Sequence, residues 1–274
     1  MNVQSVTFRQ LERAGRLGNQ LFQVAATVGI ARAIGARPCL PPRWSYRPYL
    51  NVPDEWFRPA RGRAIEAWAW EGLEYMDERA RLYLQDPALF RDVADEIRSA
   101  FQPKEAPAVE HLGWNRRWGD GIALHVRRGD LLTQEQGFQP ALTEDAPGYY
   151  RSALDAIDPM DVMPVVVFSD CANWCRDYMR VVAGRPVEVW FGKPRSHKPS
   201  EYRRQMPEDW VDLILMSQFD HLVMSNSTFA WWAAWLNPDR DVLYPDLWWG
   251  PRLSHLDHHV MIPPEFGWRE VPCG

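Results

Sequence analysis

The sequence predicts an α/β protein with two lobes, each built on a doubly wound parallel sheet. Short apolar runs alternate with stretches of helical period from about residue 121 to residue 245, and this alternation is typical of a parallel sheet covered by helices. A further strand–turn–helix pattern opens the chain, at residues 6–34. The length of 274 residues suits two such lobes, and we place them at 1–118 and 119–274.

The first lobe shows clear predicted elements only in its first 42 residues. Residues 6–11 (VTFRQL) predict a short strand, and the small-residue run from Gln20 to Ile34 predicts a helix. A second strand is expected within 36–42 (ARPCLPP), where the prolines end it. Residues 41–118 show only fragments of helical period, such as 86–101.

The second lobe has a regular order of predicted elements. The predicted strands are 121–127, 164–169, 187–191, 221–225 and 241–245, and the predicted helices are 147–157, 172–183, 208–219 and 227–237. The loop 192–207 is basic and long. A solvated surface loop is its simpler interpretation, and a flap beside a ligand is the alternative.

Composition and charge exclude several function classes. Hydrophobic residues make up 46% and charged residues 24% of the chain, as in an ordinary globular enzyme. The formal net charge of −5 argues against a nucleic-acid partner. The longest apolar run, FAWWAAWL, falls far short of the ~20 residues of a membrane span, and the N-terminus has no signal-peptide core. We expect a cytoplasmic protein with at most peripheral contact at the inner membrane face.

Cysteine and tryptophan usage adds two expectations. The four cysteines contain no CxxC pair, so free thiols in a reducing compartment are expected rather than a metal knuckle or a disulfide framework. Fifteen tryptophans are many for this length. Most are expected to pack in the core, although flat rings also stack on sugars.

Two adjacent arginines end the apolar run ALHVRRGDLL. Side chains alternate along a strand, so His125 and Arg127 are expected on one face, and Arg128 and Asp130 on the other. We expect Arg127 to bind an anionic ligand, because the guanidinium fork matches a phosphate, and Arg128 to form an internal ion pair with Asp130. Alternatively, both arginines pair within the protein. Ligands of open α/β sheets bind beyond the carboxyl ends of the strands, which favours the ligand.

A polar corner separates a predicted strand from an alanine–tryptophan helix in 223–237 (VMSNSTFAWWAAWLN). Asn226, Ser227 and Thr228 occupy the helix start, where unpaired N–H groups and the helix dipole attract an anion. Ser227 or Thr228 is also an ordinary N-cap residue. The two interpretations are compatible, because a capping hydroxyl at this corner can also face a phosphate.

The stretch 15–20 (GRLGNQ) resembles a phosphate-binding turn between strand and helix, but neither GxGxxG nor GxxxxGK[ST] is present. Gly18 allows a ligand to approach the main chain closely, and the Asn19 amide both donates and accepts hydrogen bonds. By itself this stretch is a weak indication of a binding site.

Two stretches contain residue types that bind metals. Residues 255–259 (HLDHH) offer three histidines and an aspartate, but no matching ligands are evident elsewhere, so we interpret them as a polar surface segment. Residues 239–241 (DRD) follow a proline between a helix and a strand, and we interpret them as a turn. No metal is therefore expected.

Taken together, GRLGNQLFQVAA, HVRRGD, FSD and DLILMSQFDHLVMSNSTFAWWAAWLNP resemble the α-1,2-fucosyltransferase family, here most like its bacterial members. The match covers both ends of the chain and fades between about 41 and 118. The resemblance implies a GT-B fold of two Rossmann-like lobes. It further implies transfer of L-fucose from GDP-β-L-fucose to the 2-hydroxyl of a galactose-containing oligosaccharide or glycolipid, with inversion and without a metal or other cofactor.

The resemblance also implies roles for individual residues. Arg127 would bind the donor diphosphate with Ser227 and Thr228, and Asp212 would contact the guanine. Gly18 and Asn19 would reach the donor or acceptor from the first lobe. The expected substrate-binding residues are Gly18, Asn19, His125, Arg127, Asp170, Asp212, Ser227 and Thr228, and the expected catalytic residues are Asn19, Arg127 and Asp130. The general base stays open among Asp130, Glu144 and Asp145.

The sequence departs from the family pattern at Leu131, where the family often has tyrosine after HVRRGD, and in a short first lobe rich in Trp and Pro. Two other functions compete with fucosyl transfer. One is a transferase of the same fold that uses another nucleotide sugar or acceptor. The other is a non-catalytic, Trp-rich carbohydrate-binding protein.

Overall fold

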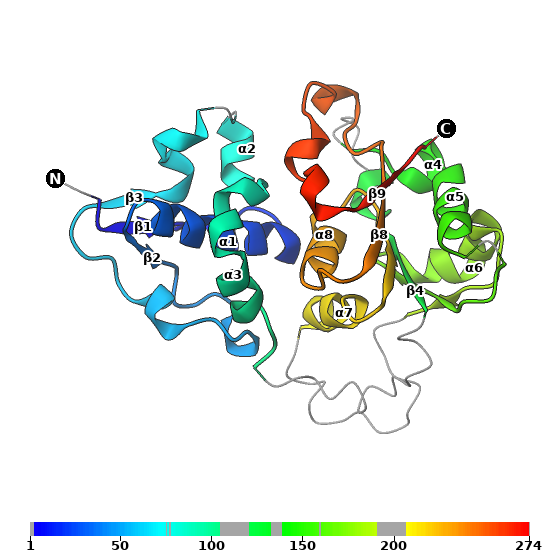
Figure 1. The fold of residues 1–274 in the computed structure, drawn as a ribbon, viewed down its shortest axis with the longest axis horizontal. Helices are drawn as coiled ribbons and strands as arrows, with labels where there is room; N and C mark the ends of the chain where they lie inside the picture. The colour runs from blue at the N-terminus through cyan, green and yellow to red at the C-terminus, as the bar shows by residue number, and fades with distance from the viewer. Residues whose placement is uncertain are drawn as a thin grey trace. The chain divides into compact units, whose positions relative to one another are not determined.

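The computed structural model of the chain describes residues 3–74, 76, 78–104, 121–132, 139–158, 160–190 and 207–273. The chain divides into two compact units, Met1–Ala106 and Pro107–Gly274, which follow one another from blue to red in Figure 1. The boundary that the sequence suggests, at 118, falls outside the described residues. Each unit contains a sheet whose paired strands are parallel, so the predicted α/β class is confirmed.

The first unit is built on a three-stranded parallel sheet in the order β2-β1-β3. Its strands are β1 (Ser5–Thr7), β2 (Arg37–Cys39) and β3 (Ala64–Glu66), and its α-helices are α1 (Leu17–Ala33), α2 (Glu78–Tyr83) and α3 (Ala94–Ala100). Short 3₁₀ turns fill much of the rest, at Arg47–Tyr49, Asp54–Phe57, Ala67–Ala69, Glu71–Leu73 and Pro87–Val93.

Several predicted bounds in this unit were wrong. The strand expected at 6–11 ends at Thr7 because the chain turns directly after it. The helix expected from Gln20 begins at Leu17, so Gly18 and Asn19 lie in its first turn and not in a loop. The helical stretch 86–101 starts as a 3₁₀ helix with a proline in its first turn, capped by the Asp86 carboxylate, which accepts the Ala88 N–H at 2.8 Å.

The second unit has a six-stranded sheet in the order β6-β5-β4-β7-β8-β9. Numbered within the unit this order is 3-2-1-4-5-6, the Rossmann arrangement, and it reverses direction between β4 and β7. The strands are β4 (Ile122–Val126), β5 (Val165–Ser169), β6 (Glu188–Val189), β7 (His221–Val223), β8 (Asp241–Pro245) and β9 (Arg269–Val271). The helices are α4 (Leu142–Asp145), α5 (Gly148–Ile157), α6 (Ala172–Ala183), α7 (Glu208–Met216) and α8 (Thr228–Trp235).

Helices cover both faces of this sheet, with α5 and α6 on one side and α7 and α8 on the other (Figure 1). Strand β4 is buried at every residue, as expected of a central parallel strand. Leu124 and Val126 pack into one core cluster with Leu154 of α5. His125 points the other way, with its ring centroid 5.6 Å from that of Phe229 on α8. The alternation predicted from the sequence therefore holds within the strand itself.

The Tyr149 hydroxyl joins α5 to the sheet where β7 ends, so we expect its removal to lower the stability of the fold. It is fully buried and lies 2.5 Å from the main-chain oxygen of Met224 and 3.3 Å from that of Leu243. Tyr149→Phe leaves a buried carbonyl without its donor, and we expect it to lower the free energy of unfolding by about 1–3 kcal/mol. Urea denaturation measures this. Tyr178→Phe on α6 is the matched control, because that tyrosine is 54% exposed and its change is expected to stay within about 0.5 kcal/mol.

The tryptophans of the described residues belong mainly to the interior. The buried ones are Trp44, Trp56, Trp210, Trp231, Trp232, Trp235 and Trp248, and the other described tryptophans are partly buried. The three tryptophans of α8 pack against one another with ring centroids 4.9–6.0 Å apart. Packing therefore accounts for their helical spacing, as the sequence predicted.

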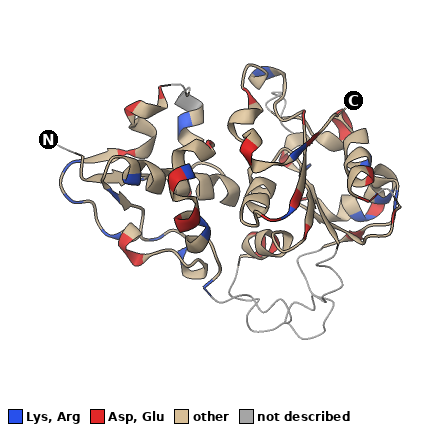
Figure 2. Ribbon diagram, viewed as in Figure 1, with Lys and Arg blue, Asp and Glu red and all other residues tan. Residues whose placement is uncertain are grey.

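The charged side chains and the cysteines of the described residues are spread over both units. Lys and Arg are interspersed with Asp and Glu along both units (Figure 2). All four cysteines are free, as predicted, and burial raises the pKa of the Cys175 thiol to about 11. Within the part of the chain that the structure describes, no helix has the length and apolar character needed to cross a bilayer.

Candidate active site

The switch point between β4 and β7 brings together two polar segments of the sequence. His125 near the end of β4 and Ser225 just after β7 are both buried, and His125 Nδ1 lies 2.8 Å from Ser225 Oγ. This hydrogen bond ties the ends of the two strands together. In open α/β sheets, ligands bind in the crevice outside the carboxyl ends of the strands at such a point.

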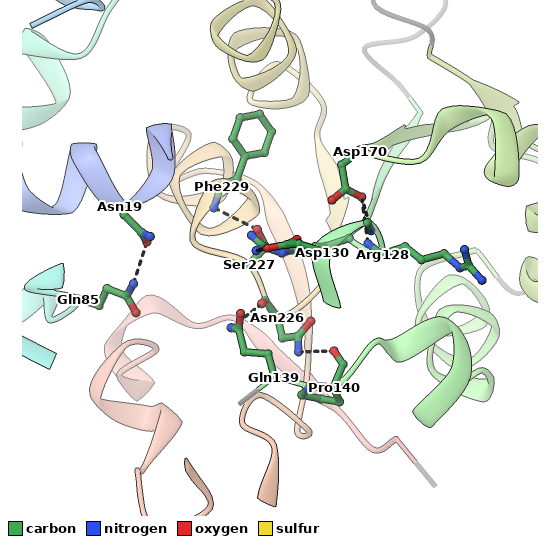
Figure 3. A network of polar contacts seen from close by, with 12 residues as sticks. Asn19, Gln85, Arg128, Asp130, Gln139, Pro140, Asp170, Asn226, Ser227 and Phe229 are labelled. Atoms are coloured by element: carbon green, nitrogen blue, oxygen red, sulfur yellow. Dashed lines mark hydrogen bonds and ion pairs between the residues drawn. The ribbon is translucent and has the colours of Figure 1, made fainter. Parts of the chain in front are cut away.

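Asp170, directly after β5, holds the turn that follows β4. Its Oδ1 accepts the main-chain N–H groups of Arg128 at 3.0 Å and Gly129 at 3.2 Å (Figure 3). A Cβ atom added to Gly129 would lie 2.9 Å from Asp170 Oδ2. The Asp170 carboxylate, together with the lack of a side chain at Gly129, fixes the path of the main chain beside Arg127.

The two arginines have different partners from those that the sequence predicted. Arg127 pairs with Asp130, its Nη2 lying 2.9 and 3.2 Å from the two carboxylate oxygens. Arg128 contacts Glu144 Oε1 through Nη2 at 2.7 Å and Nε at 3.2 Å, and its guanidinium lies 4.2 Å from the centre of the Trp174 ring. The predicted Arg128–Asp130 pair was therefore wrong, and both arginines pair within the protein, as the alternative interpretation expected. Strand β4 ends at Val126, so alternation does not govern the residues beyond it.

This arrangement also bears on the three carboxylates considered as a general base. Asp130 is engaged with Arg127. Glu144 is engaged with Arg128 and with the Thr143 hydroxyl. Asp145 Oδ2 accepts the Ala141 N–H at 2.8 Å, at the start of α4. Each of them thus has a defined structural contact.

The corner after β7 is fixed by hydrogen bonds from three directions. Ser227 caps α8, its Oγ accepting the Phe229 N–H at 3.3 Å, so the N-cap interpretation is confirmed. Asn226 is fully buried and donates through Nδ2 to the main-chain oxygens of Pro140 at 3.0 Å and Trp248 at 3.3 Å. Its own main-chain oxygen accepts Gln139 Nε2 at 3.1 Å (Figure 3). Thr228, the first residue of α8, lies at the same edge.

Some buried polar atoms at this edge have no protein partner. Among the described residues, Asn226 Oδ1 and the indole nitrogens of Trp248 and Trp249 are buried without a hydrogen-bond partner. Buried polar groups normally have one, so these atoms are suited to contact a polar ligand. The sequence pointed to Asn226 only through its place beside Ser227, and nothing in the pattern singled out Trp248 or Trp249.

Asp212 lies on α7 and contacts the segment that follows β6, the strand two places from β4 in the sheet. Its Oδ1 accepts the indole N–H of Trp190 at 2.6 Å, and Trp190 directly follows β6. Because parallel strands end at the same edge of the sheet, this pair belongs to the carboxyl edge as well. Trp190 is a contact that the sequence did not predict, because a single tryptophan at a strand end carries no pattern.

In the first unit, the GRLGNQ stretch forms a turn and the start of α1. Gly15 adopts a φ of +82°, and a Cβ atom there would lie 2.1 Å from Asn19 Nδ2, so only glycine fits. Asn19 Oδ1 accepts Gln85 Nε2 at 2.8 Å (Figure 3). Gly18 is buried in the first helical turn. Ligand contacts from Gly18 and Asn19 stay predictions.

Within the second unit, the structure gathers most predicted residues at one edge. His125, Arg127, Asp130, Ser227 and Thr228 follow or end the two strands of the switch point, Asp170 supports them from β5, and Asp212 lies toward β6. The basic loop 192–207 lies outside the described residues except for Pro207. The guanidinium of Arg127, which is paired with Asp130, and the N-terminus of α8 both offer N–H donors at this edge, so the edge is suited to bind a phosphate or diphosphate.

Comparison with known proteins assigns the chain to a family. Residues 80–244 match glycosyl transferase family 11, a span that contains the HVRRGD turn, Asp212 and the corner after β7. The chain is 28% identical over 251 residues to galactoside alpha-(1,2)-fucosyltransferase 1 of Alouatta caraya and 30% identical over 254 residues to that of Ateles belzebuth. These matches cover 81% of the chain but only 63% of each relative. The chain belongs to glycosyl transferase family 11.

Proposed function

We propose that the chain transfers L-fucose from GDP-β-L-fucose to the 2-hydroxyl of a galactose-containing oligosaccharide or glycolipid, with inversion. The observation that carries the proposal is the placement of two anion-binding groups at one switch point. Arg127 follows β4, the capped N-terminus of α8 follows β7, and these two strands are neighbours in the sheet. The names of the relatives support fucose and galactose as the transferred and accepting sugars.

Arg127 and the start of α8 would stabilise the leaving group. Cleavage of the sugar–phosphate bond leaves a nucleoside diphosphate and an oxocarbenium-like centre on the sugar. The guanidinium fork binds phosphate oxygens through two parallel N–H groups, and the α8 N-terminus adds its dipole. A preorganised donor of this kind contributes about 3–4 kcal/mol, or about 10²–10³ in rate. These charges supply the role that a metal fills elsewhere, so we propose that transfer needs none.

Asp130 fits an orienting role for Arg127 better than that of a base. Its two oxygens lie within 3.2 Å of Arg127 Nη2, which fixes the guanidinium beside the turn. His125 is buried and hydrogen-bonded to Ser225, so we assign it the role of fixing the end of β4 next to the sugar.

Inversion requires a single displacement, with the acceptor hydroxyl attacking from the face opposite the diphosphate.

We expect Asp212→Ala to weaken GDP binding by about 10-fold or more. The substitution removes the carboxylate, and with it the charge-assisted hydrogen bonds that we assign to the guanine N–H groups. Isothermal titration calorimetry with GDP measures the change. Trp190→Phe is the matched variant: it removes the indole N–H on Asp212 Oδ1 but keeps the carboxylate, so a smaller loss is expected. If Asp212→Ala binds GDP as tightly as the wild type, the guanine site is elsewhere.

A donor panel tests the function as a whole. The chain is incubated with a galactoside and with GDP-fucose, GDP-mannose, UDP-galactose or UDP-glucose, and released nucleoside diphosphate is measured with and without EDTA. We expect release that depends on the galactoside with GDP-fucose alone, unchanged by EDTA. Turnover of another donor would indicate a transferase with different specificity. Binding of glycans without turnover of any donor would indicate a carbohydrate-binding protein.

A further inference from the structure

Two histidines and two carboxylates meet near the C-terminus, and none of them belongs to the proposed donor site. Asp257, His258 and His259 offer ligand atoms that all lie within 4.8 Å of one another. The sequence showed no matching ligand elsewhere, but the structure brings one from β9: Glu270 Oε1 lies 2.7 Å from His258 Nε2 and 3.8 Å from His259 Nε2. Two imidazoles and a carboxylate from separate elements thus face one another.

His259 is already oriented as a metal-binding histidine is. Its Nδ1 lies 2.8 Å from Asp257 Oδ1, and the same oxygen accepts the His259 main-chain N–H at 2.8 Å. An ionised carboxylate only accepts hydrogen bonds, so Nδ1 is the donor in this pair. Nε2 is then left with its lone pair. A carboxylate behind the second ring nitrogen is the usual outer partner of a ligating histidine.

Glu270 is held in place from the sheet. It pairs in parallel register with Tyr244 of β8. The Tyr244 ring also meets the His258 ring edge-on, with centroids 6.1 Å apart. The side chains of His259 and Glu270 are 48% and 39% exposed, so an ion can reach them from solvent.

We propose that His258, His259 and Glu270 bind Zn²⁺, with Asp257 and Tyr244 orienting two of the three ligands. Two imidazole nitrogens and one carboxylate form a donor set that Zn²⁺ favours. Tetrahedral Zn²⁺ with bonds of 2.0–2.2 Å places its ligand atoms about 3.4 Å apart. The distances from Glu270 Oε1 to His258 Nε2, 2.7 Å, and to His259 Nε2, 3.8 Å, lie on either side of that value. The ion would join the turn at His258–Val260 to β9.

Calorimetric titration of the full chain with ZnCl₂, after treatment with a chelator and buffer exchange, tests the proposal. We expect saturable binding of one equivalent, weakened at least about 10-fold in His258→Ala and in Glu270→Gln. His255→Ala is the matched control and should bind as the wild type does, because His255 lies in the same segment but outside the cluster. Zn²⁺ should raise the unfolding midpoint of the wild type but not that of His258→Ala.

Three results would overturn the site: no saturable binding by the wild type, wild-type affinity in both His258→Ala and Glu270→Gln, or an equal loss in His255→Ala. Thermal unfolding without metal confirms that each variant is folded. The outcome is independent of the proposed transfer, which uses none of these residues and is expected to tolerate EDTA.

Discussion

Arg127→Lys is expected to lose about 10²–10³ of transfer activity, measured as kcat with GDP-fucose and a galactoside. Lysine keeps the positive charge, so Asp130 keeps an ion-pair partner and the protein stays folded. It cannot, however, present two parallel N–H groups to a diphosphate. The loss should fall on kcat, because charge builds up on the diphosphate as the bond to the sugar breaks.

Arg128→Lys provides the matched comparison for this variant. Arg128 contacts Glu144 and lies over the Trp174 ring, so its substitution should lower stability by up to about 1 kcal/mol. Its effect on transfer should stay below about 10-fold, since in our account it binds no substrate. Near wild-type kcat in Arg127→Lys, or an equal loss in both variants, would contradict the assignment of Arg127 to the diphosphate.

Asp170→Ala is expected to lower kcat by about 10²-fold, because Asp170 holds the main chain of the turn beside Arg127. Its Oδ1 accepts the N–H groups of Arg128 and Gly129, and without that acceptor the turn no longer fixes Arg127. Misplacement of a catalytic group by about 1 Å can cost 10²-fold in rate. Asp170→Asn retains an oxygen acceptor and should restore most of the activity in the same steady-state assay.

Gly129→Ala tests the same turn from the opposite side. The new methyl group would lie 2.9 Å from Asp170 Oδ2 and push the carboxylate away from the main chain. We expect a loss of kcat similar to that of Asp170→Ala, with the affinity for free GDP changed less than kcat.

If Asp170→Asn is as inactive as Asp170→Ala, the negative charge itself is required, and Asp170 contacts substrate or a reacting group directly.

Much of the second unit could be predicted from the sequence, and the reason is its burial. A strand such as β4, buried at every residue, gives an uninterrupted apolar run, and the amphipathic α6 gives a clear helical period; its predicted range, 172–183, is the observed one. The polar segments HVRRGD and SNST interrupt these patterns, and they therefore indicated a candidate binding site. The fold then placed them at the switch point, as parallel topology requires.

The parts that could not be predicted depend on contacts between distant residues. Strands β3 and β9 are three residues long, which is too short for a period to appear. The observed partners of the two arginines depend on the end of β4 at Val126 and on Glu144, which lies sixteen residues beyond Arg128. Glu270 reaches the histidines of 258–259 only because β9 lies beside β8.

The central claim is tested most directly by the structure of the product. GDP-fucose and a β-galactoside are incubated with the chain, and the linkage of the purified product is determined by two-dimensional NMR. We expect a single fucose joined through an α bond to the galactose 2-hydroxyl, which requires inversion at the donor carbon. A β-linked fucose, a bond to another hydroxyl, or release of GDP without any glycoside product would contradict the account.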